Sequence, residues 1–130
     1  MIFGIGVDCV ETKRIEKLLN QFDEKAVNRL FTQEEQNRAE KASFPEDRIR
    51  TFAKRYAAKE AFSKALGTGI GAIDFKDVEV INSASGAPIL KLSEKGQKLL
   101  LEKTGSNQTR LHLSLSDERE IAVAFVVIEV

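Results

Sequence analysis

The sequence contains one cysteine and one histidine, no tryptophan, and no excess of charge of either sign. A single cysteine excludes an internal disulfide framework and a zinc site built from several cysteines, and it is typical of a reducing compartment. Because the 20 basic and 20 acidic side chains cancel, the field of the whole molecule selects neither nucleic acid nor an anionic membrane. We therefore expect no nucleic-acid partner.

Long hydrophobic runs are also missing. The longest, IAVAFVVI at residues 121–128, is far shorter than the roughly 20 residues that a membrane-spanning helix needs. The first residues, MIFGIGVDC, lack the basic start and long apolar stretch of a secretory signal peptide. These features predict a cytoplasmic protein without a membrane partner.

The composition that remains is typical of one soluble globular domain. Apolar residues make up 42% and charged residues 31% of the chain, which argues against disorder. A length of 130 residues suits one hydrophobic core and leaves little room for a second. We predict a single domain spanning residues 1–130.

Strand-like and helix-like patterns are mixed without regular βαβ spacing, which predicts an α+β fold with a small antiparallel sheet. Residues 1–10 alternate as a strand. Its apolar face is expected in the core and carries Phe3, Ile5, Val7 and Cys9. Residues 109–116 and 119–130 are expected to pair as antiparallel strands joined at Asp117-Glu118, and residues 75–92 form a hairpin around SASG.

Four helices are expected. The first covers residues 12–22 with Thr12 as its N-cap and places Ile15, Leu18, Leu19 and Phe22 at helical spacing. The second, at 32–42, starts with a capping box formed by Thr32 and Glu35. A long helix runs from about residue 45 to 66 and ends at Gly67, and a fourth covers 93–105.

On the long helix, Glu60 lies on a polar stripe with small neighbours. At about 100° per residue, its face also carries Ala53, Tyr56, Ala57, Ser63, Lys64 and Gly67. The opposite face, expected in the core, carries Ala58, Phe62, Ala65 and Leu66. Small residues let a ligand or another backbone approach, although Glu60 and Lys64 alone also fit an ordinary surface ion pair.

Asp8 ends a strand face that otherwise carries Gly4 and Gly6, and glycine within a strand often marks close approach of a backbone or a ligand. Carboxylates from Asp8 and Glu60 would suit a hard cation such as magnesium. The alternative is that Asp8 only turns the chain before the next helix.

Two further features, the GTGIG segment and His112, each allow a functional or a structural interpretation. A third, Cys9, is expected to be structural. The amides of GTGIG at 67–71 could meet phosphate oxygens, but Gly67 is also explained as a helix cap. His112 shares a polar strand face with Ser114 and Ser116, a pattern more typical of a surface residue than of a catalyst. Cys9 is expected to be buried and is not predicted to be a nucleophile.

Two segments strongly resemble the signatures of the holo-acyl-carrier-protein synthase family, the small bacterial type of 4'-phosphopantetheinyl transferase. They are GIGVDCVETKRI at 4–15 and FAKRYAAKEAFSKALGTGI at 52–70. The strand HLSLSDE is similar to the family's H-x-S-x-S-H, although Asp117 stands where the family often has a second histidine. The resemblance covers nearly the whole chain.

The resemblance implies a magnesium-dependent transfer of 4'-phosphopantetheine from coenzyme A to a serine of apo-acyl carrier protein, with release of adenosine 3',5'-bisphosphate. It implies Asp8 and Glu60 as metal ligands and Lys64 as the side chain that neutralises the pyrophosphate. Further contacts to coenzyme A are assigned to Ser63, Gly67, Thr68, Gly69 and His112. The serine proton could leave to a metal-bound water or to Glu60.

The resemblance also implies partners. Acyl carrier proteins are acidic, so Arg14, with Lys13 and Lys17 nearby, is expected to meet the carrier protein. Solvated surface charge remains an alternative for Lys13 and Lys17. A phosphopantetheinyl transferase-like fold and a homotrimer with active sites between subunits are expected as well, and the apolar run IAVAFVVI is compatible with a trimer.

Two other functions use the same residues differently. A magnesium-dependent hydrolase of the coenzyme A or nucleotide pyrophosphate would use Asp8, Glu60 and Lys64 with water as the acceptor, and it would need no basic docking helix. A non-catalytic nucleotide-binding module would need neither carboxylate as a metal ligand.

Overall fold

The computed structural model describes the backbone of residues 1–130 and every side chain except that of Asp23. It confirms the predicted α+β class. The strands are β1 (Ile2–Glu11), β2 (Val78–Asn82), β3 (Pro88–Leu92), β4 (Arg110–Glu118) and β5 (Ile121–Glu129). The helices are α1 (Thr12–Leu30), α2 (Gln33–Glu40), α3 (Pro45–Leu66) and α4 (Glu94–Thr104), with a 3₁₀ turn η1 (Phe75–Asp77).

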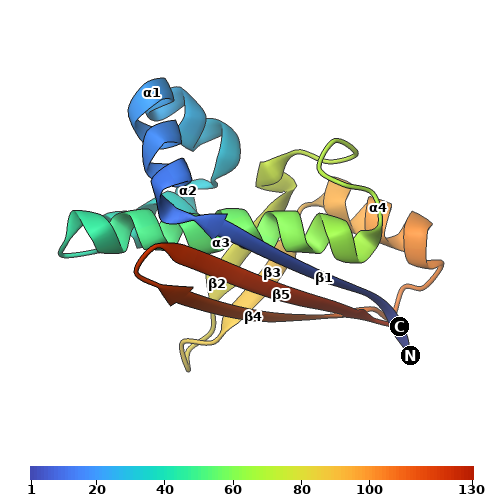
Figure 1. Cartoon of the computed structure of the whole chain (residues 1–130). Helices are drawn as coiled ribbons and strands as arrows, with labels where there is room; N and C mark the ends of the chain where they lie inside the picture. The colour runs from blue at the N-terminus through green and yellow to red at the C-terminus, as the bar shows by residue number, and fades with distance from the viewer.

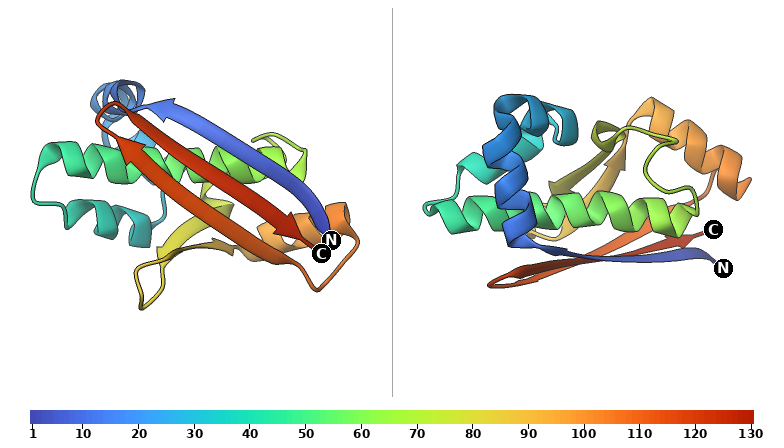
Figure 2. Two further views of the ribbon diagram at one scale, coloured as in Figure 1. Left: turned by 60° about the horizontal axis from the view of Figure 1, so that its bottom comes forward. Right: turned by 45° about the horizontal axis from the view of Figure 1, so that its top comes forward.

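The strands form two antiparallel groups on either side of α3. One is a three-stranded sheet in the order β1-β5-β4, and the other is the hairpin of β2 and β3. Figure 1 shows α3 crossing the middle of the molecule, with α1 standing across it, and both views of Figure 2 place the three-stranded sheet on one side of α3. The predicted long central helix is confirmed, and it ends at Gly67 with a left-handed φ of 82°.

Two glycines of β1 let the sheet lie directly against α3. A Cβ atom at Gly4 would sit 1.9 Å from the carbonyl oxygen of Ala65, and one at Gly6 would sit 1.9 Å from that of Ala61. Any side chain at these positions would push the strand off the helix. The sequence allowed either a backbone or a ligand to approach these glycines. In the structure the backbone of α3 does so.

The prediction for the faces of β1 was wrong. Phe3, Ile5 and Val7 are 39%, 57% and 52% exposed, and Cys9 is exposed too. The inner face is the one with the glycines, because only glycine admits the helix backbone. The apolar side chains of β1 therefore lie on the outer face of the sheet, where they continue onto β5.

Most helix and turn predictions are confirmed, with shifted ends. The capping box of Thr32 and Glu35 is present, and α4 lies between Ser93 and Gly105 as expected. The N-cap of α1 is Glu11 rather than Thr12, and α1 continues well beyond residue 22. Phe22 is 60% exposed and not part of the core. The turn between β4 and β5 lies at residues 119–120, since the strand pairing continues through Glu118.

A buried ion pair connects α3 to the elements on its far side. Lys59 Nζ lies 2.7 Å from Glu35 Oε1, and both side chains are fully buried. Lys59 also donates to the carbonyl oxygens of Phe75 and Val78, while Glu35 accepts from the amide of Val80. Burial lowers the pKa of Lys59, and Glu35 opposes that effect. This pair joins α2, α3 and β2 at one point.

Candidate functional site

The packing of β1 on α3 brings Asp8 to Lys64. Asp8 is two residues past Gly6 on the inner face, within the strand and not at its end. Lys64 Nζ lies 3.2 Å from Asp8 Oδ1 and donates to the carbonyl oxygen of Val7 at 3.0 Å. Asp8 is therefore paired across elements. No ion pair joins Lys64 to Glu60 among the described side chains, although they are one turn apart.

Glu60 lies on the same side of α3, one turn after Tyr56. The pKa of Tyr56 is raised, first by burial, while Arg14 lowers it and the carboxylates of Glu60 and Asp8 raise it. Both acids thus influence the ionisation of the same phenol. Asp8 and Glu60 are far apart in the sequence, and the contact of β1 with α3 brings their two segments together.

Arg14 of α1 reaches the same place. Its Nη2 donates to Tyr56 Oη at 3.4 Å, and its guanidinium carbon lies 5.7 Å from the centre of the Tyr56 ring. The sequence patterns assign Tyr56 no role of its own. The available signal was its position one turn before Glu60 on the same helix face.

The two lysines next to Arg14 are exposed on α1. They line an open depression of about 440 Å³ whose walls also include apolar surface from Leu18 and Phe22. Basic and apolar groups therefore lie together on this side of α1. The lining residues are Glu11, Lys13, Arg14, Lys17, Leu18, Gln21 and Phe22.

Ser63 is not placed to meet a ligand, which corrects its assignment to coenzyme A. It is 1% exposed, and its hydroxyl donates to the carbonyl oxygen of Glu60 at 2.7 Å. The amides of Gly67, Thr68 and Gly69 all donate to the carbonyl oxygen of Ser63. These amides close the helix end, and a phosphate would have to replace that carbonyl as their acceptor.

His112 lies on the outer face of the sheet, away from Asp8. It is opposite Val127 on β5, whereas Asp8 is opposite Ala124 on the inner face. Its Nε2 is 2.8 Å from Glu129 Oε2, and this hydrogen bond lowers the pKa of Glu129. Within one chain, the structure does not bring His112 together with the two acids.

Asp117, where the family pattern often has histidine, makes ion pairs with α3. Its carboxylate oxygens lie 3.1 Å from Lys54 Nζ and 3.6 Å from Arg50 Nε. An acid at this position therefore attaches the edge strand β4 to the helix.

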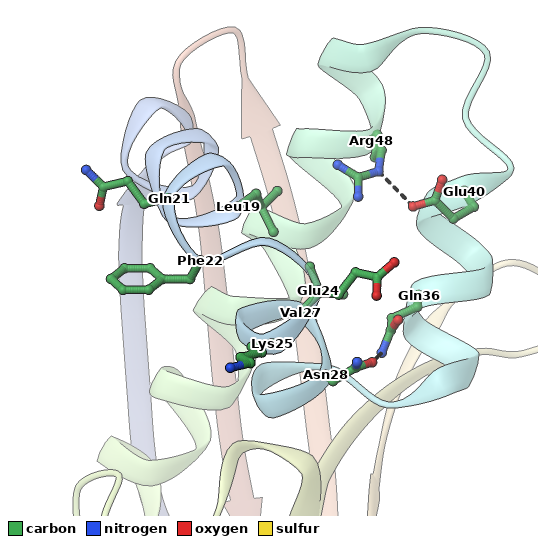
Figure 3. A pocket seen from close by; sticks show the side chains of 10 residues that line it. All are labelled: Leu19, Gln21, Phe22, Glu24, Lys25, Val27, Asn28, Gln36, Glu40 and Arg48. Carbon is green, nitrogen blue, oxygen red and sulfur yellow. Dashed lines mark hydrogen bonds and ion pairs between the residues drawn. The ribbon is translucent and has the colours of Figure 1, made fainter.

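A larger depression, about 1140 Å³, is elsewhere. It lies between α1, α2 and the start of α3 (Figure 3) and is lined by Leu19, Val27 and the ion pair of Glu40 with Arg48, among others. Asp8, Glu60 and Lys64 do not line it. The candidate site is therefore identified by its charged side chains and not by the size of a cavity.

The donor set fits magnesium. Asp8 and Glu60 offer carboxylate oxygens, and both side chains are partly exposed. Asp8 already binds a cation, the ammonium group of Lys64. Magnesium is commonly held by one or two carboxylates, with waters and substrate phosphates completing its shell. Among the described residues no larger cluster of acidic, histidine or cysteine side chains competes as a metal site. No helix in the described part of the chain has the length and apolar character needed to cross a membrane.

The sequence profile of the 4'-phosphopantetheinyl transferase superfamily matches residues 4–126. A holo-[acyl-carrier-protein] synthase of Bartonella bacilliformis is 44% identical over 99% of this chain and 96% of its own length. The crystal structure of the Neisseria meningitidis synthase superposes with a TM-score of 0.86 at 42% identity, covering 99% of both chains. The Bacillus anthracis synthase, solved in complex with CoA (3',5'-ADP), has a TM-score of 0.79 at 41% identity over 98% of this chain and 96% of that one.

Proposed function

The chain belongs to the 4'-phosphopantetheinyl transferase superfamily, and from this premise we propose that it transfers the 4'-phosphopantetheine group of coenzyme A to a serine of apo-acyl carrier protein. The other product is adenosine 3',5'-bisphosphate. The observation that carries the proposal is the grouping of Asp8, Glu60 and Lys64 around one side of α3, next to Arg14. The nucleotide bound to the Bacillus anthracis relative supports coenzyme A as the donor.

In the proposed reaction the serine oxygen bonds to phosphorus while that phosphorus releases the bridging oxygen of the diphosphate. Negative charge spreads over the phosphoryl oxygens, so catalysis depends on positioning and on cations placed around them. Lys64 provides one, since its exposed ammonium group stands at the edge of the site. Asp8 and Glu60 would hold magnesium, which supplies further charge neutralisation when bound. The serine proton leaves to water in the site or to Glu60.

Coenzyme A is proposed to lie along the end of α3, where Gly67, Thr68 and Gly69 follow Lys64. His112 can reach such a ligand only from another copy of the chain, because it lies on the outer face of its own sheet. The outer face supports a homotrimer: its apolar side chains from β1 and β5 are exposed and run together in register, with Val7 opposite Phe125 and Ile5 opposite Val127.

The carrier protein is proposed to dock on α1. Arg14, Lys13 and Lys17 supply positive charge, and the exposed ring of Phe22 supplies apolar area beside them. Charges of this kind mainly raise the association rate, so binding should weaken with salt. The exposed free thiol of Cys9 supports a reducing cytoplasm as the site of action.

Mass spectrometry tests the function directly. The protein is incubated with coenzyme A, magnesium and several apo-acyl carrier proteins, and a carrier protein is expected to gain the mass of the phosphopantetheine arm. Cleavage of coenzyme A at the same rate without a carrier protein would establish the hydrolase instead. Binding without cleavage would establish a non-catalytic module.

A further inference from the structure

We propose that Glu129 is a positioning residue that holds the imidazole ring of His112 ready to contact a phosphate group of coenzyme A bound by a neighbouring copy of the chain. Arg110 fixes the carboxylate of Glu129 in turn. The inference rests on the proposed function for its ligand and on the proposed trimer for the neighbouring site. The contacts inside the group belong to a single chain.

The register of the sheet gathers the three side chains on its outer face. Arg110 of β4 lies directly opposite Glu129 of β5, and His112 is two residues further along β4. Residues two apart on a strand share a face, and diagonal neighbours on paired strands are within reach of long side chains. One carboxylate on β5 can therefore meet two side chains on β4.

The carboxylate of Glu129 uses one oxygen for each partner. Arg110 Nη2 donates to Glu129 Oε1 at 2.9 Å, and His112 Nε2 lies 2.8 Å from Oε2. An isolated surface ion pair contributes little, but a carboxylate held by two partners is part of a network. Each contact limits the freedom of the other two groups, so the orientation of the carboxylate sets that of the ring.

Glu129 is also the member of the group with the most firmly held backbone. β5 is the central strand of its sheet, and Glu129 is paired with Ile2 on one side and with Arg110 on the other. Its side chain is partly buried, whereas Arg110 and His112 are exposed on the edge strand β4. An exposed side chain ordinarily changes rotamer within nanoseconds, and Glu129 restrains that motion for His112.

The hydrogen bond also decides which ring nitrogen is left for a ligand. The bond with His112 lowers the pKa of Glu129 most, burial opposes it, and Arg110 and the N-terminal ammonium group lower it further. Glu129 is therefore ionised at neutral pH and can only accept, so Nε2 carries a proton. Nδ1 remains for the ligand, and in the protonated ring it donates to a phosphate oxygen.

Preorganisation is the expected benefit of this arrangement. Immobilising a flexible side chain when a ligand binds costs affinity, and holding the side chain beforehand avoids that cost. His112 would approach coenzyme A from a different copy than Lys64 does. Its orientation therefore has to be set within its own sheet, which is what the contact with Glu129 provides.

The affinity for coenzyme A, measured by titration calorimetry with magnesium present, tests the proposal. We expect His112→Ala to weaken binding about tenfold, because a charge-assisted hydrogen bond is lost. Glu129→Leu should weaken it about fivefold, because the ring is no longer ordered beforehand. In the double variant, Glu129→Leu should add nothing to the effect of His112→Ala. An equal effect in both backgrounds, which a damaged fold or trimer would also produce, overturns the proposal, as does no effect of Glu129→Leu.

Two further variants separate positioning from general charge. Arg110→Gln should weaken binding about twofold, and only while Glu129 is present, because Arg110 acts through that carboxylate. Glu102→Leu removes the same charge at an exposed position of α4 and should leave the affinity unchanged. Weakening by Glu102→Leu equal to that by Glu129→Leu would refute a specific role of Glu129.

The mobility of the ring can be measured directly because His112 is the only histidine in the chain. In histidine-labelled protein, carbon-13 relaxation should give the ring an order parameter near about 0.85 in the wild type, and below about 0.6 in Glu129→Leu. A mobile ring in the wild type, or an equally ordered ring in the variant, would overturn the proposal.

The transfer assay run in parallel distinguishes the two proposals. An ordered ring and coupled affinities without transfer would support the positioning role and refute the proposed function. Transfer with independent effects of Glu129→Leu and His112→Ala would refute the positioning role alone.

Discussion

At the scale of single residues, the exposure of α3 singles out its candidate functional side chains. Between Phe52 and Leu66 every side chain of α3 is buried except those of Lys54, Glu60 and Lys64. Lys54 is paired with Asp117, and the other two face the candidate site. Because this segment of α3 is buried on nearly all sides, an acid at position 60 fits a chemical role better than a role in solubility.

Replacing Glu60 by Gln tests this role, because the substitution exchanges one carboxylate oxygen for an amide nitrogen. We expect Glu60→Gln to lower the rate of phosphopantetheine transfer about 100-fold or more at saturating magnesium, because the amide cannot replace a charged ligand. Circular dichroism should show an unchanged fold, since the side chain is partly exposed. Glu46→Gln, at an exposed position in the first turn of the same helix, is the control. Full activity of Glu60→Gln would remove this residue from the metal site.

The single tyrosine also allows a test by pH. In metal-free protein, absorbance should show Tyr56 ionising above its ordinary pKa near 10, because burial and the carboxylates of Glu60 and Asp8 disfavour the phenolate. Glu60→Gln removes a negative charge and should lower this midpoint. Arg14→Gln removes the positive charge that stabilises the phenolate and should raise it. Shifts of the opposite sign would contradict the placement of these groups.

At the scale of elements, α3 is held from one side by an ion pair and from the other by close backbone contact. The pair of Lys59 and Glu35 joins it to α2 and β2, while Gly4 and Gly6 let β1 lie on its surface. The lysine of the signature segment that precedes Glu60 is thus structural. The site depends on both attachments, because Asp8 arrives on β1 and Glu60 on α3.

Breaking the buried pair should destabilise the protein strongly. Lys59→Met leaves the Glu35 carboxylate buried without a counter-charge, a change that typically costs about 3–5 kcal/mol. Adding Glu35→Gln removes that charge but keeps an oxygen for the Val80 amide, so the double variant should recover much of the loss. Urea unfolding measures both. A double variant less stable than Lys59→Met would show that charge is not the cause.

The strand contact makes a separate prediction. In Gly6→Ala the new methyl group would meet the Ala61 carbonyl oxygen, and backbone cannot move aside cheaply, so we expect a loss of about 3 kcal/mol. Asp8 would be displaced with the strand, and transfer activity should fall. Gly71→Ala is the control, because a Cβ there meets nothing within 4 Å. Thermal unfolding distinguishes them, and equal stability of the two variants would exclude close packing at Gly6.

At the scale of the whole molecule, the outer face of the three-stranded sheet is the surface that a monomer leaves uncovered. Ile5, Val7 and Phe125 are 57%, 52% and 43% exposed side by side on β1 and β5. His112 lies on the same face at the edge strand β4. A trimer built on this face would cover the apolar side chains and bring His112 toward a neighbouring site.

Light scattering tests that assembly. The wild type is expected to have the mass of a trimer, and Val7→Lys should dissociate it and reduce transfer, because a buried unpaired charge opposes association. Leu101→Lys makes the same kind of change at a position 47% exposed on α4 and should leave the trimer intact. A monomeric wild type with full activity would rule out a site shared between copies.

The sequence by itself determined the local structure and the chemical family. Capping residues, periodicity and turn residues predicted the α+β class, the hairpin and the long helix from Pro45 to Gly67, because these signals act within a few residues. The two signature segments, at fixed separation, predicted the superfamily that residues 4–126 match. They also identified Asp8 and Glu60 as candidate metal ligands, but not how the two side chains are arranged in space.

Only the tertiary structure decided which faces and partners are used. Alternation in β1 defines two faces, but the approach of α3 selects the one with Gly4 and Gly6, which places Cys9 outside. Helical spacing suggested a pair of Glu60 with Lys64, yet Lys64 binds Asp8, and Arg14 reaches Tyr56 across 42 residues of sequence. Such contacts arise from packing between distant segments, and local periodicity carries no information about which segments will meet.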